Sequence, residues 1–212
     1  MADRGGSSER RAGRTVRHMR ADAQRSIDAL LQSAMAVFVT SGVDAPVRQI
    51  AEKAGVGIGT VYRHFPKRSD LIVAVFRREV DACADAAAIL AAEHQPGEAL
   101  ARWMQRYVDF ISAKRGLATA LHSGDPAYDS LPAYFQKRLR PALQTLLERA
   151  AAAGDVRAGV DPDDLLRAAA SLCAPAHGGD PAHARRMVAL LVDGLRYGVS
   201  SSRRSRSPRV RS

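Results

Sequence analysis

The chain has 212 residues, of which 46% are hydrophobic, and its 32 Lys and Arg against 22 Asp and Glu give a formal net charge of +10. No apolar run reaches the roughly 18 residues that a membrane-spanning helix needs, and the N-terminus has no apolar signal-peptide core. These features exclude the membrane and secreted classes, so we expect a cytoplasmic protein with a sizeable core and no membrane partner.

Much of the positive charge lies at the two ends of the chain. Residues 1–25 carry seven Arg against three acids, and residues 199–212 carry five Arg and no acid. Highly charged segments with few apolar residues rarely bury enough surface to fold, so both are predicted to be disordered, as a basic arm and a basic tail. The arm fits a solvated segment and a phosphate-binding segment equally well.

The first predicted helix starts at Ser26, where an apolar stripe begins, and it ends at Gly42. Residues 45–71 then read APVRQIAEKAGVGIGTVYRHFPKRSDL. Two short helical patterns in this run are separated by Gly55, which suits a helix C-terminus, and the second pattern ends before Pro66. Pro46 suits the first position of the first short helix. Two short helices about a glycine-bearing turn are typical of a helix-turn-helix.

The second short helix of this motif carries an exposed face of hydrogen-bond donors. Thr60, Arg63 and His64 lie on it, and Lys67 and Arg68 follow closely. Phosphates accept hydrogen bonds, and guanine presents acceptors in the major groove, so these side chains indicate contact with DNA. The apolar residues of the motif are expected in the core: Ile50, Val61 and Phe65.

The run VRQIAEKAGVGIGTVYRHFPKRSDL resembles the DNA-binding signature of the TetR (tetracycline-repressor) family of bacterial transcription regulators. The match covers about 30 residues and includes the glycine pair, the T-x-Y-x-H-F core and the basic cluster. The resemblance implies an all-α fold of about nine helices. Residues 26–78 would form a three-helix DNA-binding domain, and residues 79–198 a helical ligand-binding and dimerisation domain. Lys67 departs from the family, which often has a Ser or Thr helix cap there.

The same resemblance implies which residues contact double-stranded DNA. Arg48 would reach a base edge or a phosphate from the first helix of the motif. The residues implied to face the major groove are Ile58, Gly59, Thr60, Tyr62 and Arg63. The residues implied to grip phosphates are Tyr62, His64 and Lys67 or Arg68.

A long helix is predicted from Lys67 to Ala92, and it is expected to join the two domains and to act as a lever between them. Helical patterns follow over 98–114, 117–122 and 132–154 and contain the only Trp. In the family, equivalent helices enclose a pocket for a small inducer, which implies a small, mostly apolar ligand. The same stripes also fit plain core, and both interpretations stay open. The candidate pocket residues are Trp103, Met104, Tyr107, Phe110, Leu121, His122, Phe135 and Leu139, with Arg106 and Gln136 as further polar tips.

The last two predicted helices begin at Asp161-Pro162 and Asp180-Pro181, each an N-cap followed by proline. The final helix is apolar on two sides, more than packing against one neighbour requires. We therefore expect these helices to form the seam of a homodimer, whose two recognition helices read a palindrome. The candidate interface residues are Leu165, Ala169, Leu172, Met187, Leu190, Leu191, Gly194 and Leu195.

Patterns typical of enzymes and metal sites are missing. Cys83 and Cys173 have no metal-like spacing and are expected to be buried thiols, with a redox switch as the weaker alternative. There is no H-E-x-x-H and no G-x-S-x-G, and G-V-G-I-G-T lacks the lysine of a phosphate loop. We expect no enzyme activity, no metal and no cofactor.

The sequence thus predicts a homodimeric transcription regulator, most simply a repressor that binds a palindromic operator and is released by an unidentified small ligand. The alternatives are a constitutive DNA-binding or architectural protein without an inducer, and a transcriptional activator of the same fold.

Overall fold

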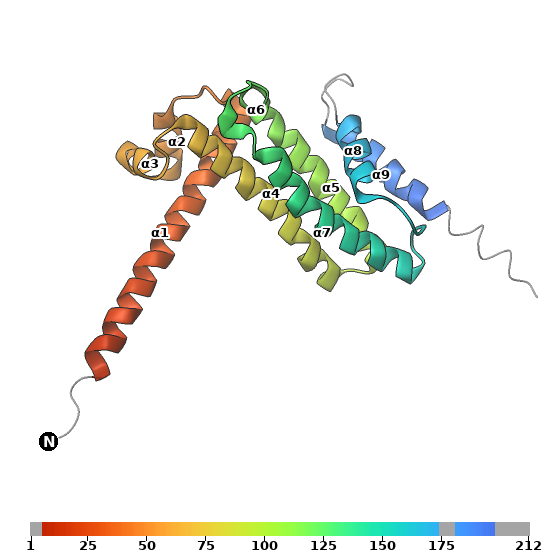
Figure 1. The fold of residues 1–212 in the computed structure, drawn as a ribbon, viewed down its shortest axis with the longest axis horizontal. Coiled ribbons are helices and arrows are strands. Elements are labelled where there is room, and N and C mark those ends of the chain that lie inside the picture. The colour runs from red at the N-terminus through yellow and green to blue at the C-terminus, as the bar shows by residue number, and fades with distance from the viewer. Residues whose placement is uncertain (1–5, 174–180, 198–212) are drawn as a thin grey trace, which may run out of the picture. The chain divides into compact units, whose positions relative to one another are not determined.

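The computed structural model describes residues 6–173 and 181–197 (Figure 1). These residues form nine α-helices and two short 3-10 helices, and they contain no strand. None of the described helices is long and apolar enough to cross a membrane. The chain divides into two compact units whose boundary, between Val75 and Phe76, falls inside α4 (Arg68–Glu93). The predicted all-α fold is confirmed.

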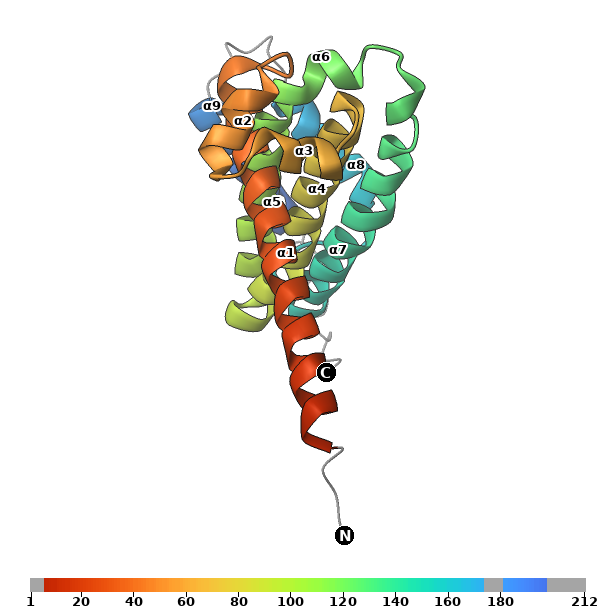
Figure 2. The same ribbon diagram turned by 90° about the vertical axis from the view of Figure 1, so that its left-hand side faces the viewer.

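The first unit holds α1 (Gly6–Ser41), α2 (Val47–Ala54), α3 (Ile58–His64) and the start of α4. Figure 2 shows α2 and α3 beside the C-terminal end of α1, and α2 packs against both of these helices. Ile50 and Val61 are fully buried, as expected, while Phe65 is half-buried.

α1 begins at Gly6, far before the start predicted at Ser26, so the prediction of a disordered arm is wrong for residues 6–25. This segment contains six Arg, three Ala and no Pro, residue types that permit a helix without an apolar stripe. Extending an existing helix costs much less than nucleating one. The stripe therefore marks where α1 packs, and not where it begins. Residues 1–5 and the basic tail at 199–212 lie outside the described residues.

The turn between α2 and α3 is closed by Gly55, whose φ of 68° lies in the left-handed region. The Gly55 N–H donates to the Glu52 carbonyl at 3.1 Å, and the Val56 N–H donates to the Ala51 carbonyl at 3.0 Å. These bonds satisfy the last carbonyls of α2 in the manner of a Schellman motif, and only glycine adopts this φ without strain. Pro46 is the N-cap of α2 and not its first residue, a shift of one position from the prediction.

The second unit is built around α5. Its elements after α4 are α5 (Pro96–Lys114), η1 (Arg115–Leu117), α6 (Ala118–Leu121), η2 (Pro126–Tyr128), α7 (Leu131–Ala153), α8 (Pro162–Leu172) and α9 (Pro181–Tyr197). Within this unit α5 packs against α7, α8 and α9, and α8 packs against α7 and α9. Asp161 caps α8 by accepting the N–H groups of Asp163 at 2.7 Å and Asp164 at 3.2 Å, as its sequence predicts.

Two aromatic residues of α5 have their polar ends satisfied inside the core. The Trp103 Nε1–H donates to the Cys83 carbonyl of α4 at 2.8 Å, and the Tyr107 hydroxyl donates to the Leu166 carbonyl of α8 at 3.2 Å. The two rings stack with centroids 5.9 Å apart and planes 5° apart. Buried polar groups need such partners, so these bonds attach α5 to the helices on both sides.

Charged and aromatic side chains join α4 to α7. Arg138 contacts Asp81 at 2.5 Å and Asp85 at 2.7 Å, and the Tyr134 hydroxyl donates to the Asp81 carboxylate at 2.7 and 2.8 Å. The Arg77 guanidinium lies 5.1 Å from the centroid of the Tyr134 ring. Burial and the hydrogen bond to Asp81 raise the pKa of Tyr134 above its usual value. One face of α7 is thereby fixed to α4.

Candidate functional site

The exposed face of α3 includes two large side chains that the first unit does not bury. Ile58 is 46% exposed and Tyr62 is 51% exposed, whereas Val61 between them is 0% exposed. Ile58 and Tyr62 are four residues apart and therefore lie on one face of the helix. Gly59, Arg63 and His64 are also exposed, and Thr60 is half-buried. A short helix with this much exposed contact area is a candidate interaction surface.

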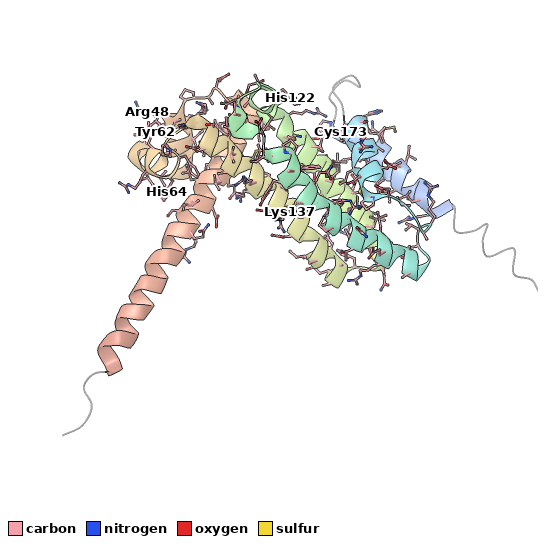
Figure 3. The ribbon with its side chains drawn as sticks, viewed as in Figure 1. Arg48, Tyr62, His64, His122, Lys137 and Cys173 are labelled. Atoms are coloured by element: carbon pink, nitrogen blue, oxygen red, sulfur yellow. The ribbon has the colours of Figure 1, made fainter. Side chains whose placement is uncertain are left out.

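Several donors around α3 have no partner in the described part of the chain. The side chains of Tyr62, Arg63 and Lys67 make no hydrogen bond and no ion pair with any described residue. The His64 ring lies near the neighbouring Phe65 ring, with 6.3 Å between their centroids. Arg48 on α2 is exposed and pairs with Glu52 at 3.0 Å. Figure 3 shows Arg48, Tyr62 and His64 gathered at the α2–α3 pair.

Arg68 has a different role from the one predicted for it. Its guanidinium donates to the carbonyl oxygens of Val43 and Ala45, in the loop between α1 and α2. Arg68 therefore holds the loop between α1 and α2 against α4, whereas the Lys67 side chain has no partner among the described residues. The missing Ser or Thr cap at position 67 is partly replaced by Asp70, whose carboxylate accepts the Lys67 backbone N–H at 2.9 Å.

A cavity of about 340 Å³ lies within the second unit, near the N-terminal end of α7. Its lining consists of Phe76, Lys114, Leu121, His122, Tyr128, Leu131, Pro132, Phe135 and Gln136. Its volume is at the lower end of the range of small-molecule sites, roughly 300–1,000 Å³. The lining is mostly apolar with a few polar groups, which is the usual character of such sites.

Three of the eight candidate pocket residues, Leu121, His122 and Phe135, line this cavity. Phe110 contacts two of the lining rings: its ring centroid lies 6.2 Å from that of Phe76 and 6.0 Å from that of Phe135. The remaining four candidates, Trp103, Met104, Tyr107 and Leu139, are fully buried core residues that do not line it. Of the two further polar tips, Gln136 lines the cavity, while Arg106 donates to the Ala82 carbonyl at 3.3 Å.

Lys114 is the lining residue that sequence reasoning missed and could have found. It follows Tyr107 by seven residues and Phe110 by four, so it occupies the apolar stripe of α5 where a hydrophobic residue is expected. A lysine on the apolar face of a helix favours the interpretation that this part of the face lines a binding site instead of the core. Burial lowers the pKa of Lys114 below its usual value, because a less hydrated ammonium is less stable.

The residues predicted at a dimer seam fall into two groups. Leu165, Ala169 and Leu195 are buried inside their own unit. Leu172, Met187 and Leu191 are half-buried, Gly194 is exposed, and Leu190 is 62% exposed. On α9, positions 187, 190, 191 and 194 follow the i, i+3, i+4, i+7 spacing of a single apolar stripe. The adjacent face of α9, with Ala184, Val188, Val192 and Leu195, is buried, so this helix is apolar on two neighbouring sides, as its sequence indicates.

The two cysteines are buried and unreactive in character. Burial raises the pKa of the Cys83 thiol to about 12 and also raises the pKa of Cys173. A thiol that stays protonated is a poor nucleophile, so this environment does not favour the redox-switch alternative. Among the described residues, no three His, Cys, Asp or Glu side chains are grouped so that they could hold a metal ion.

Comparisons with known proteins identify the family. The model of the bacterial regulatory proteins of the tetR family matches residues 30–75, and the model of the SbtR-like transcriptional regulator C-terminal domain matches residues 95–197. A crystal structure of a TetR transcriptional regulator from Streptomyces coelicolor is 39% identical, with a TM-score of 0.69, over 80% of this chain and 97% of that chain. The chain belongs to the TetR family. It is therefore a DNA-binding transcription regulator and not an enzyme.

Other relatives agree with this membership. The TetR transcription regulatory protein from Mycobacterium vanbaalenii is 36% identical, with a TM-score of 0.66, over 84% of this chain and 99% of that chain. An HTH-type transcriptional regulator of Staphylococcus aureus (strain USA300) is 38% identical over 64 residues, which are 30% of this chain and 35% of that protein. The match to that regulator thus spans about a third of its length.

Replacing Arg68 and Lys67 separately should distinguish a bracing residue from a free one. We expect Arg68→Met to lower the free energy of unfolding by about 1–3 kcal/mol, because the Val43 and Ala45 carbonyls lose charged donors. Lys67→Met should leave stability within about 0.5 kcal/mol, because its side chain is exposed and unpaired. Chemical denaturation of both variants measures the difference, and equal stabilities would contradict the bracing role.

Proposed function

We propose that this TetR-family regulator is a repressor that binds a palindromic operator as a homodimer and is released from it by a small ligand. The observation that carries the proposal is that one chain has both an unpaired donor face on α3 and a mostly apolar cavity in its second unit. A constitutive DNA-binding protein has no need of the second feature.

For DNA contact, α3 would enter the major groove. Ile58, Gly59, Thr60, Tyr62 and Arg63 would approach the base edges, where Arg63 is suited to guanine and Ile58 to a thymine methyl group. The exposed donors His64, Lys67 and Arg48 would bind phosphates and fix the register, and the Tyr62 hydroxyl could reach a phosphate as well as a base edge. We leave Arg68 out of this contact set, because its guanidinium already holds two backbone carbonyls.

A single helix of seven residues reads few base pairs, so two copies are needed for a specific operator. The outer stripe of α9, with Met187, Leu190, Leu191 and Gly194, supports dimerisation, and the half-buried Leu172 of α8 is a further candidate for the seam. An isologous pairing of this stripe would present two α3 helices one or more DNA turns apart, roughly 34–36 Å or a multiple.

Ligand release requires that the cavity and α3 respond to each other. α4 contributes to both units, because Arg68 braces the first unit and Phe76, further along the same helix, lines the cavity. A ligand that binds more tightly to a conformation with wrongly spaced α3 helices would shift the population away from the DNA-binding state. Coupling energies for such shifts are typically about 1–3 kcal/mol.

Selection of bound sequences from random duplex DNA at near-physiological salt should yield a palindromic consensus. The double variant with Tyr62→Ala and His64→Ala should bind the selected operator on the order of 10- to 100-fold more weakly, because charge-assisted contacts to phosphates are lost. Fluorescence anisotropy with a labelled operator measures both affinities.

Lys137→Ala is the matched control for that experiment, because Lys137 is an exposed cation on α7 of the second unit. It should bind the operator as the unaltered protein does. Unchanged affinity in the double variant, with stability and dimer intact, would show that α3 does not contact DNA through these two residues.

Leu190→Glu should separate the protomers, since an isologous seam would receive two buried carboxylates with no partner. We expect the dimer dissociation constant to rise at least about tenfold. Ile89→Glu is the control, because Ile89 is 58% exposed, similar to the 62% of Leu190, but lies on α4. Analytical ultracentrifugation gives the dissociation constants, and an unchanged dimer in Leu190→Glu would refute the α9 seam.

A further inference from the structure

The Lys114 ammonium faces two aromatic rings and, within residues 6–173 and 181–197, no acid. Its Nζ lies 5.7 Å from the centroid of the Phe76 ring and 5.8 Å from that of the Phe135 ring. No described residue forms a hydrogen bond or an ion pair with it. Cation–π contacts compensate only part of the hydration that an ammonium gives up on burial. Lys114 is half-buried, and its partly dehydrated ammonium has no negatively charged partner among the described residues.

The cavity that Lys114 lines has an uneven charge. Its lining contains one lysine and neither Asp nor Glu, and its other polar members are His122, Tyr128 and Gln136. The electrostatic preference of this cavity is consequently for an anion.

A larger cavity of about 530 Å³, between α7 and the loop before α8, lacks this property. Its charged lining residues are Arg140, Glu148, Arg157 and Asp161, two of each sign. Arg140 is also paired with Asp163 at 3.0 Å. Cations and anions therefore balance there, whereas the 340 Å³ cavity has the single cation Lys114 and no acid in its lining.

We propose that the 340 Å³ cavity binds a small monocarboxylate whose carboxylate pairs with Lys114 and whose apolar body packs against Phe76 and Phe135. This inference rests on the proposed function, because it gives the chemical class of the releasing ligand. The carboxylate would form charge-assisted hydrogen bonds with the ammonium, and these bonds would replace the water contacts that Lys114 loses on burial. Leu121, Leu131 and Pro132 supply the remaining apolar wall.

The amount of space limits the ligand to a small molecule. A cavity of about 340 Å³ admits a single ring with a short chain more readily than a long acyl chain or a macrocycle. Aromatic bodies fit because the two flanking rings can take further edge or stacked contacts. Phenylalkanoates are therefore suitable probes, and their primary amides are uncharged controls of almost the same shape.

The test is isothermal titration of the full chain with benzoate, phenylacetate and 3-phenylpropionate, and with the three matching amides. We expect at least one acid to bind, with its amide on the order of 10- to 100-fold weaker. Lys114→Met should lower the affinity for that acid by a similar factor and leave the affinity for the amide unchanged. Lys114→Arg should restore part of the acid affinity, because it restores the charge.

Lys137→Met serves as the matched control, because it removes an exposed lysine that does not line the cavity. It should bind the acid as the unaltered protein does. The apo form of Lys114→Met should melt at the same temperature or higher at neutral pH. The lowered pKa means that the charged lysine costs the folded state stability below that pKa, and the cost shrinks as pH rises through it.

Three outcomes would overturn the carboxylate proposal: acids and amides binding equally, Lys114→Met binding the acid normally, or none of the acids binding at millimolar concentration. None of these outcomes affects the proposed repressor function, which is tested through the operator and the dimer. An uncharged ligand that releases the operator would refute the carboxylate class and support the repressor.

Discussion

The burial of α5 is the constraint on which the second unit depends. Trp103 and Tyr107 are too large and too polar at one end to be buried without partners, and they find these partners in the Cys83 and Leu166 carbonyls. The two bonds set how α4 and α8 approach α5. Once these rings fill the centre, they cannot also surround a ligand. The space that is left lies at the end of α5, where the helix stripe continues into Lys114.

Local signals in the sequence predicted most of the fold. Gly55 placed the turn, Asp161 with Pro162 placed a helix start, and apolar spacing placed the inner faces of α1 and α5. The spacing does not show which distant residues each helix contacts in the folded chain. Trp103 and Phe135 belong to similar stripes, yet one is core and the other lines a cavity, because that depends on neighbours far away in the chain. The sequence pattern places Arg68 at the DNA for the same reason: its carbonyl partners lie more than twenty residues away along the chain.

The features that favour regulation are those that cost stability. An exposed Ile58 and Tyr62, an apolar outer stripe on α9, and a lysine between two phenylalanines all leave the isolated chain with unsatisfied surface. Each has a partner in the proposed function, namely DNA, a second protomer and a carboxylate. Functional sites commonly break local rules of folding in this way. Membership of a family of DNA-binding regulators explains the exposed face of α3, whereas the α9 stripe and Lys114 are features of this chain's own residues.

If the cavity and α3 are coupled, a cavity ligand and the operator must each weaken the binding of the other. The measurement is the affinity of the dimer for its selected operator with and without a cavity ligand, and the affinity for that ligand with and without operator. Linkage requires both affinities to fall by the same factor, about 5- to 150-fold for coupling energies of about 1–3 kcal/mol. A ligand that occupies the cavity and leaves operator affinity unchanged would show that the two sites are independent, and the protein would not be a ligand-released repressor.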